Sequence, residues 1–314
     1  MRALRPLAVL ALSLAASGGL AACQSMPSAE RLTDAPITAP IYPGPTDSQR
    51  ALQSLGAPEA PIAVAVYGFT DQTGQFRPSE TGQTLSRAVS QGGSSMLMRA
   101  LQDAGRRSWF QVIEREQLNH LLNERQIIKD MRERYLGETV GTAPAIPPLL
   151  FAGVLLEGGV VGYDSNTLTG GVGAGLLGIS ASQQYRQDTV TVYLRAVSVA
   201  TGEVLTTVTA SKTIASQALG ANAFRYIAFK QLLEAEAGIT TNEPDQLALQ
   251  QAIEKAVYAL VVEGADLGFW TFKDAEAAWP SIWAYRQERD GVLTAAQAER
   301  VRTTTPAVAA EGGR

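Results

Sequence analysis

The fold is decided by residues 167–187, which read TLTGGVGAGLLGISASQQYRQ. Between positions 168 and 176 the apolar side chains stand at even positions, and threonine and glycine fill the odd ones. Beyond Gly178 the parity reverses, so that apolar residues occupy the odd positions up to Tyr185, with Gln183 as the exception. Alternation in two short strands around a central turn is typical of a membrane β-hairpin. A flexible glycine-rich loop is the alternative that these residues leave open.

A second and weaker alternation covers residues 217–237. Its clearest part sets Phe229 and Leu233 against Lys230 and Glu234. The same stretch ends in a leucine- and alanine-rich run followed by Gly238, which favours a helix with a glycine cap. From the residues alone, a second hairpin and a helix both remain open.

The composition excludes several classes of function. The chain has one histidine, His120, and one cysteine, Cys23, whereas hydrolytic triads, zinc sites and redox pairs need more of these residues. Its net charge of −4 does not provide the basic surface of a nucleic-acid-binding protein. Residues 173–178 spell GxGxxG, but they lack the strand–helix context of a nucleotide site. We therefore expect no enzyme activity, no cofactor, no metal and no nucleic-acid partner.

The N-terminus has the layout of a secretory leader. Arg2 and Arg5 precede an apolar run, and the run ends in Leu-Ala-Ala-Cys at residues 20–23. This ending resembles a bacterial lipobox, which predicts a signal peptide over residues 1–22 and a lipid on Cys23. An ordinary thiol at Cys23 is the alternative. Gln24 replaces the aspartate that retains such proteins at the inner membrane, so we expect delivery to the outer membrane.

The rest of the chain divides by pattern. Residues 23–61 are proline-rich and predict an extended tether. Residues 62–166 predict alternating strands and helices: a strand at 62–67, a helix ending at Gly105, a strand at 110–113 and a helix with an apolar stripe over 118–135.

Residues 188–216 predict a β-hairpin around a turn at 200–202. Residues 238–274 predict a helix that begins at Pro244 and turns Leu249, Ile253, Val257, Leu260 and Val261 to the core. Residues 275–314 predict a C-terminal extension whose last dozen residues are disordered.

From Ile62 to Trp270 the chain resembles the curli secretion channel (CsgG) family, which includes relatives that anchor adhesive holdfasts. The stretches that carry the resemblance stand in the same order along the chain: residues 71–78, 121–128, 162–166, 170–174, 201–203, 211–214, 224–227 and 241–244. The resemblance implies an α+β fold, with a periplasmic α/β vestibule domain and two membrane hairpins at 167–187 and 217–237. It also implies a homo-oligomeric ring of nine lipoproteins that share one β-barrel.

The resemblance implies a pore constriction in the loop at 76–89. Matching this loop to the family places Leu85, Thr84 and either Ser79 or Glu80 at the throat, where curli members carry a phenylalanine, an asparagine and a tyrosine. The alternative makes Leu85 the first core residue of the following helix. Because neither aromatic residue is present, a holdfast-type cargo is an expectation beside a curli-type one.

These inferences predict an outer-membrane, lipid-anchored channel that exports unfolded adhesive or amyloid-type subunits by diffusion, without ATP. The partners that the resemblance implies are further copies of the chain, the secreted subunits, and periplasmic and surface accessory proteins. The rival prediction is a monomeric periplasmic lipoprotein adaptor that regulates assembly of the cell envelope.

Overall fold

The computed structural model describes Tyr42 and residues 44–73, 92–138, 146–169, 184–220, 223–227 and 244–304. The chain divides into two units, with the boundary between Gly44 and Pro45. The helices and strands described below belong to the second unit, which begins at Pro45.

The described helices and strands follow one another in a mixed order. They are α2 (Asp47–Gln53), β1 (Ile62–Asp71), α3 (Gly93–Asp103), η3 (Ala104–Arg107), β2 (Phe110–Glu114), α4 (Leu118–Leu136), β3 (Val154–Thr169), β4 (Gln184–Ser198), β5 (Val204–Gly220), β6 (Ala223–Ile227), α5 (Pro244–Asp266), α6 (Ala275–Arg289) and α7 (Ala295–Thr304). The predicted strands at 62–67 and 110–113 and the predicted helix from Pro244 are confirmed.

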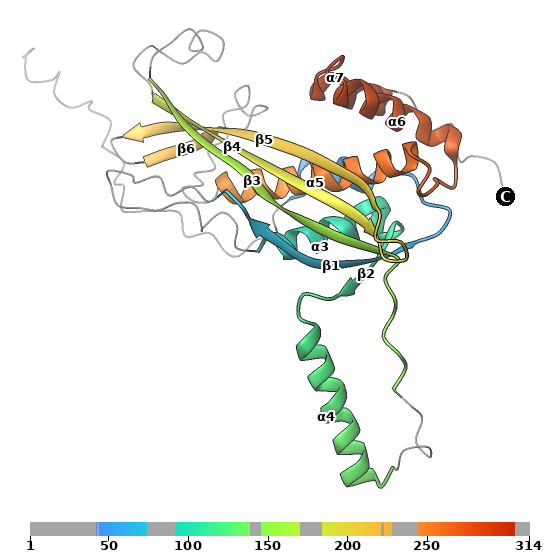
Figure 1. Ribbon diagram of the computed structural model, residues 1–314. Helices are drawn as coiled ribbons and strands as arrows, with labels where there is room; N and C mark the ends of the chain where they lie inside the picture. Colours follow the sequence, from blue (N-terminus) through green and yellow to red (C-terminus); the bar gives the residue numbers. More distant parts are fainter. Residues whose placement is uncertain are drawn as a thin grey trace, which may run out of the picture. The chain divides into compact units, whose positions relative to one another are not determined.

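The six strands among the described residues form one mixed sheet, in the order β2-β1-β3-β4-β5-β6 (Figure 1). β1 runs parallel to β2 and to β3, and the remaining neighbours are antiparallel. The predicted hairpin around residues 200–202 is confirmed, since it joins β4 to β5. The fold is therefore a mixed α/β arrangement, as the sequence predicted at this level.

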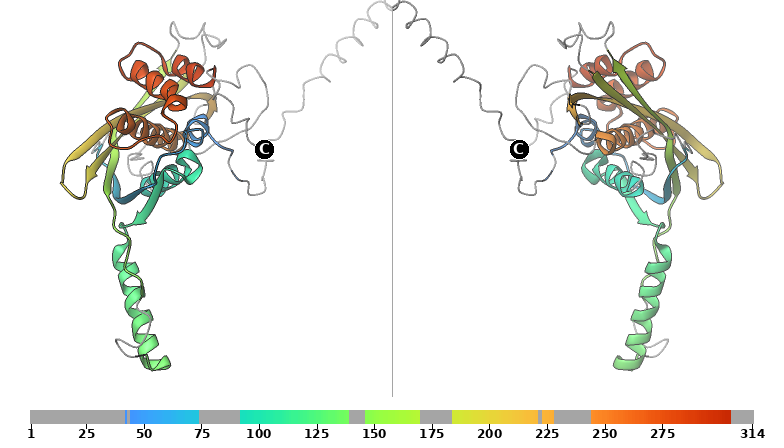
Figure 2. Two further views of the ribbon diagram at one scale, coloured as in Figure 1. Left: turned by 90° about the vertical axis from the view of Figure 1, so that its right-hand side faces the viewer. Right: turned by 90° about the vertical axis from the view of Figure 1, so that its left-hand side faces the viewer.

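Helices α2, α3 and α5 lie on one face of the sheet (Figures 1 and 2). On β4 the even-numbered residues Val190, Val192, Leu194 and Ala196 turn to these helices and are at most 1% exposed. The odd-numbered residues turn to the other face, where the hydroxyls of Thr189 and Thr213 lie 2.9 Å apart and those of Thr191 and Ser211 lie 2.8 Å apart. We call these two sides the helix-covered face and the open face.

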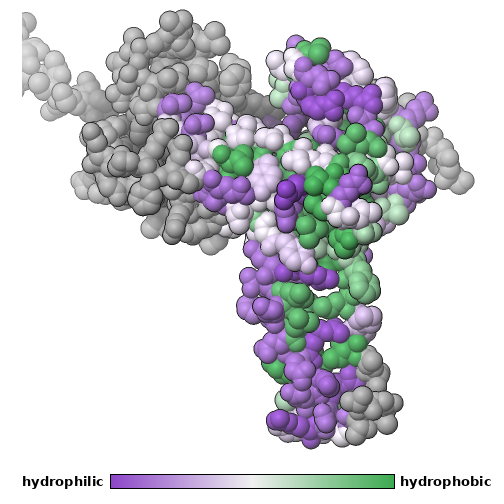
Figure 3. All heavy atoms as spheres, viewed as in Figure 1, coloured by the Kyte–Doolittle hydropathy of each residue, from purple (hydrophilic) through white to green (hydrophobic). Residues whose placement is uncertain are grey.

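Helix α4 is present where the sequence predicts it. None of its residues is buried, and it projects away from the sheet (Figures 1 and 2). Six of its large apolar side chains are between 39% and 74% exposed: Leu122, Ile127, Ile128, Met131, Tyr135 and Leu136. Figure 3 shows hydrophobic and hydrophilic residues side by side on this projecting helix. The apolar stripe therefore predicted the helix, and the structure shows that the stripe does not pack in the core of its own subunit.

The predicted tether over residues 23–61 is wrong for its last part. Residues 47–53 form α2, whose N-cap Thr46 accepts a hydrogen bond from the Gln49 amide at 2.9 Å. Leu52 is fully buried in the core. Trp109 donates its indole N–H to the Gly56 carbonyl at 2.7 Å, which fixes the chain after the helix. The sequence did not predict α2 because the segment is rich in proline and the helix is only seven residues long.

Residues 275–304 fold as two helices, α6 and α7, within the predicted C-terminal extension. Thr294 and Gln297 cap α7 reciprocally: the Thr294 amide donates to Gln297 Oε1 at 2.8 Å, and the Gln297 amide donates to Thr294 Oγ1 at 3.3 Å. Residues 305–314, where disorder is predicted, lie outside the described residues. No helix in the described part of the chain is long and apolar enough to cross a membrane.

Candidate functional site

The residues predicted to carry function lie outside the described part of the chain. This holds for the lipidation site Cys23 and for the predicted throat residues Ser79, Thr84 and Leu85. The structure does describe both ends of the segment that contains the throat residues, at the end of β1 and at the start of α3.

The first end is held by hydrogen bonds around Asp71. Its carboxylate accepts from the Thr73 amide at 2.9 Å and from the Thr73 hydroxyl at 2.7 Å. Between them, the Gln72 amide donates to the Val160 carbonyl of β3 at 2.8 Å, and Gln72 Nε2 lies 2.8 Å from the Tyr193 hydroxyl of β4. The chain therefore leaves β1 from a fixed position on β3 and β4.

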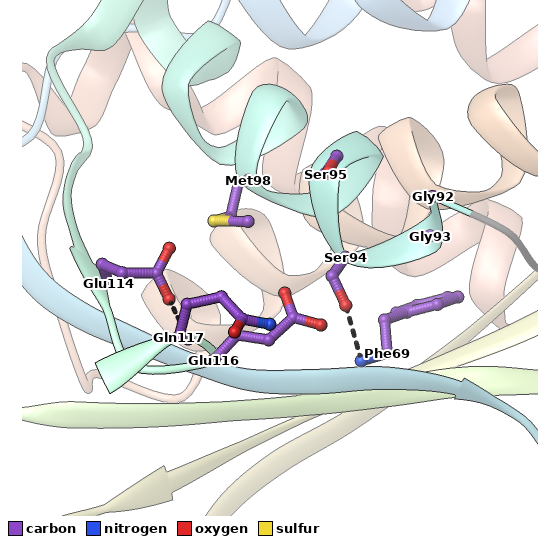
Figure 4. Close-up of a pocket in the computed structure, with 9 residues that line it drawn as sticks. All are labelled: Phe69, Gly92, Gly93, Ser94, Ser95, Met98, Glu114, Glu116 and Gln117. Carbon is purple, nitrogen blue, oxygen red and sulfur yellow. Dashed lines mark hydrogen bonds between the residues drawn. The ribbon is translucent and has the colours of Figure 1, made fainter. Parts of the chain in front are cut away.

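The second end returns to the same place. Helix α3 begins at Gly93, and Ser94 Oγ accepts a hydrogen bond from the Phe69 amide of β1 at 3.1 Å (Figure 4). A Cβ on Gly93 would lie 2.5 Å from the Phe69 ring, so only glycine permits this approach. Both ends of the segment 74–91 therefore meet at the carboxyl end of β1, on the sheet.

Glycines in β3 allow this close packing. A Cβ on Gly158 would lie 2.8 Å from the Tyr193 carbonyl oxygen, and a Cβ on Gly159 would lie 2.3 Å from the Thr70 carbonyl oxygen. A side chain at Gly158 would therefore displace β4 from β3, and one at Gly159 would displace β1 from β3, at the point where the segment leaves the sheet.

A pocket of about 510 Å³ lies beside this junction (Figure 4), at the carboxyl ends of the parallel strands β1 and β2. It is lined by Phe69, Gly92, Gly93, Ser94, Ser95, Met98, Glu114, Glu116 and Gln117. Glu114 accepts a hydrogen bond from the Gln117 amide at 2.8 Å. No motif in the sequence predicts this pocket, although the ends of parallel strands are where α/β folds form crevices. No cluster of metal-ligating side chains occurs among the described residues.

The long strands continue well past the helices. β3 and β4 pair without interruption from Gly162↔Thr191 to Thr169↔Gln184, so their antiparallel pairing enters the first predicted hairpin from both sides. A register shift between Val160 and Gly162 exchanges the faces of β3. After it, Tyr163 packs towards the core, whereas Asp164 and Asn166 are exposed.

β5 and β6 pair antiparallel from Ala215↔Ile227 to Gly220↔Ala223, and only residues 221–222 separate the two strands. The strands therefore reverse direction near the start of the second predicted hairpin, 217–237, and not at its middle. Residues 170–183 of the first predicted hairpin, and residues 221–222 and 228–237 of the second, lie outside the described part. The structure thus provides both strands that approach the first predicted hairpin and one strand, β5, that reaches the second.

Two titratable residues of α5 are unusually placed. Glu254 is 4% exposed and accepts hydrogen bonds from Thr46 and from Gln250, the latter at 2.8 Å. Burial raises the pKa of the Glu254 carboxyl despite these bonds. Burial likewise lowers the pKa of Lys255, whose ammonium lies 2.7 Å from Glu288 of α6.

The chain matches one protein family over most of its length. Residues 46–279 match the family described as "Curli production assembly/transport component CsgG". Proteins of that description from Escherichia coli (strain K12) and Salmonella typhimurium (strain LT2) are each 43% identical over 229 residues, which cover 72% of this chain and 80% of the relative. Among solved structures, a PelC dodecamer from Paraburkholderia phytofirmans covers 65% of this chain and 92% of its own, at 13% identity and a TM-score of 0.26. That score is too low to indicate a shared assembly.

Proposed function

This chain belongs to the CsgG family of curli production assembly/transport components, and from that premise we propose that it forms an oligomeric secretion channel in the outer membrane. Each subunit contributes the hairpins at 167–187 and 217–237 to one shared β-barrel. The channel exports unfolded adhesive or amyloid-type subunits.

The observation that carries the proposal is an agreement between the faces of the sheet and the alternation in the sequence. On β3 the exposed residues Asp164 and Asn166 stand at even positions, and even positions are the apolar ones from 168 onwards. On β4 the odd positions belong to the open face, and the odd positions between 179 and 185 are apolar except for Gln183. The apolar residues proposed to face lipid would therefore continue the open face of both β3 and β4.

β5 follows the same rule. Thr207, Thr209, Ser211 and Thr213 are exposed at odd positions, and Ala215 and Leu219 are the apolar residues at the odd positions that follow on this strand. Since side chains alternate along a strand, the helix-covered face would continue as the polar, lumen-facing side. Helices α3 and α5 would then lie on the side of the sheet that faces the channel axis.

A single subunit cannot form such a wall. Hairpins exposed to lipid leave unpaired backbone groups at both edges, and each unpaired group costs several kcal/mol. Copies related by rotation close the edges, with each contact formed by two different surfaces. Helix α4 supports this reading, because a helix with no buried residue and a row of exposed apolar side chains suits a neighbouring copy.

The remaining parts of the proposal follow the family. Lipid on Cys23 anchors the chain, and the α/β unit stands in the periplasm. Leu85, Thr84 and Ser79 form the throat, in a segment whose described ends meet firmly on the sheet. Transport is diffusive and needs neither ATP nor catalysis. The ring has nine subunits, and accessory proteins bias the direction of transport.

The test uses the full-length, lipidated protein extracted in detergent. Electron cryo-microscopy should display closed rings with a lumen, and planar bilayers containing the protein should conduct ions. As the matched control, a Cys23→Ser variant produced without residues 1–22 carries no lipid. Solitary particles without a lumen, combined with a Cys23→Ser protein that is monomeric and does not enter membranes, would favour the periplasmic adaptor instead.

The throat is tested in the same bilayers. Leu85→Trp should reduce single-channel conductance, because nine added rings narrow the opening. An unchanged conductance would remove Leu85 from the throat while leaving the channel itself in place.

A further inference from the structure

The helices α6 and α7 form a C-terminal module of this chain that lies mostly beyond the region matched by the family, which ends at residue 279. The module packs against α5. Tyr285 donates its hydroxyl hydrogen to Glu263, and Arg286 Nε lies 2.9 Å from both carboxylate oxygens of Asp266. Together with the pair between Lys255 and Glu288, these contacts fix the orientation of α6 on α5.

Two tryptophans on α6 differ from the other two in the chain. Trp109 and Trp270 pack into or against the core and donate their indole N–H groups to backbone carbonyls at 2.7 Å. Trp279 is 52% exposed and Trp283 is 39% exposed. Exposed tryptophans are uncommon on a surface without a partner, because each leaves a large apolar area in water.

The Trp279 ring is also held in position. The Arg286 guanidinium carbon lies 5.5 Å from its centroid, and Arg286 is itself fixed by Asp266. Because the ring is already ordered, it loses little conformational entropy when a ligand binds. The favourable free energy of even a weak contact is then not cancelled by an entropic cost. The two tryptophans stand four residues apart on one helix, which separates them by about 6 Å along its axis.

That spacing matches an extended polypeptide. Alternate side chains of an extended chain are about 6.6 Å apart and point the same way. A passing strand could therefore place residues i and i+2 on the two rings. Aromatic side chains in that arrangement gain about 0.5–1.5 kcal/mol per pair beyond the area buried.

We infer that Trp279 and Trp283 form a contact surface for the unfolded polypeptide in transit, selective for aromatic side chains at alternate positions. This inference rests on the proposed function, since the module packs on α5, which covers the face expected to lie towards the channel axis. The surface retains a chain transiently and does not fold it.

The experiment records current blockades in planar bilayers containing the full-length, lipidated protein. The probe is a synthetic 30-residue peptide of glycine, serine, asparagine and glutamine that carries tyrosine at four alternate positions. A second peptide replaces these tyrosines with serine. We expect the double variant Trp279→Ala/Trp283→Ala to shorten blockades by the tyrosine peptide about tenfold and to leave those by the serine peptide unchanged.

Two controls isolate the surface. Trp279→Phe/Trp283→Phe keeps aromatic rings and should restore most of the blockade time. Tyr67→Ser removes an aromatic residue of β1 with a similar exposed fraction, 51%, and should have no effect.

The outcomes separate this inference from the proposed function. A conducting double variant with unchanged tyrosine blockades overturns the inference and leaves the channel standing. A double variant that no longer forms rings also overturns it, because the tryptophans then contact a second copy. A wild-type protein that neither forms rings nor conducts overturns the proposed function, and this inference with it.

Discussion

Helices α4 and α5 are the two longest helices of the described chain, at 19 and 23 residues, and they are packed in opposite ways. Both carry apolar stripes in the sequence. In α5 the residues from Ala248 to Val262 are largely buried, and Leu249, Val257 and Leu260 are fully so. In α4 no residue is buried. The apolar stripe of α5 is therefore buried in the core of its own subunit, whereas the apolar stripe of α4 forms an exposed surface.

An apolar stripe therefore predicts a helix with a partner and leaves the identity of the partner open. An isolated helix of this length is marginal in water, so packing must supply most of its stability. For α5 the partner is the sheet of the same subunit. For α4 we propose a neighbouring copy.

The largest effect expected is on α5. Leu260→Ala removes a fully buried side chain and should lower the free energy of unfolding by about 2–5 kcal/mol. Ile128→Ala on α4, where Ile128 is 39% exposed, should change it by less than about 0.5 kcal/mol. Urea titration of the delipidated subunit measures both. Equal losses would mean that α4 belongs to the core of its own subunit.

A second pair compares glycines. A Cβ on Gly264 of α5 would lie 1.9 Å from the Trp270 ring, which is fixed by its hydrogen bond to Val261. Gly264→Ala should therefore cost about 1–3 kcal/mol of global stability. Gly137 ends α4 at φ +65° with no atom near its Cβ position. Gly137→Ala should fray the end of α4 alone, at a local cost of about 1–2 kcal/mol, seen as faster amide exchange there without a change in the urea midpoint.

The proposed partner of α4 gives the third prediction. Met131→Glu places a charge on the apolar stripe at a residue that is 52% exposed. It should weaken association between subunits at least tenfold, measured by sedimentation velocity, and leave the unfolding midpoint of the monomer unchanged. Asn123→Glu adds the same charge at a polar position of α4 and is the matched control. If both variants associate like the wild type, α4 does not contact a neighbouring copy.

The smallest effect concerns Glu254 of α5, whose pKa burial raises. In the folded state this carboxyl binds a proton more readily than in the unfolded state, so its contribution to stability is lost as the pH rises from the ordinary carboxyl pKa through the raised one. Glu254→Gln stays neutral throughout. Its stability relative to the wild type should therefore be highest at pH 7.5 and should fall as the pH is lowered to 5, as urea titrations at the two pH values measure. A difference that does not depend on pH would contradict the raised pKa.

Much of the fold could be predicted from the sequence. The strands β1 and β2, the β4–β5 hairpin and the helix α5 follow from local apolar periodicity, which the structure retains because each lies in the core. The short helix α2 could not be predicted, since its seven residues are stabilised by Thr46 and by the burial of Leu52 and not by any period. The throat residues remain predictions, whereas the pocket between β1, β2 and α3 has no local sequence signal at all.

The sequence by itself determined the family, the alternation at the two predicted hairpins and the types of most elements, because each of these depends on residues close together in the chain. Only the tertiary structure decided which face of the sheet the helices cover, that the ends of segment 74–91 meet at Phe69 and Ser94, and that α4 remains exposed. These properties depend on contacts between residues far apart in sequence. No local period encodes such contacts, since they arise only when the strands pair and the helices find their positions on the sheet.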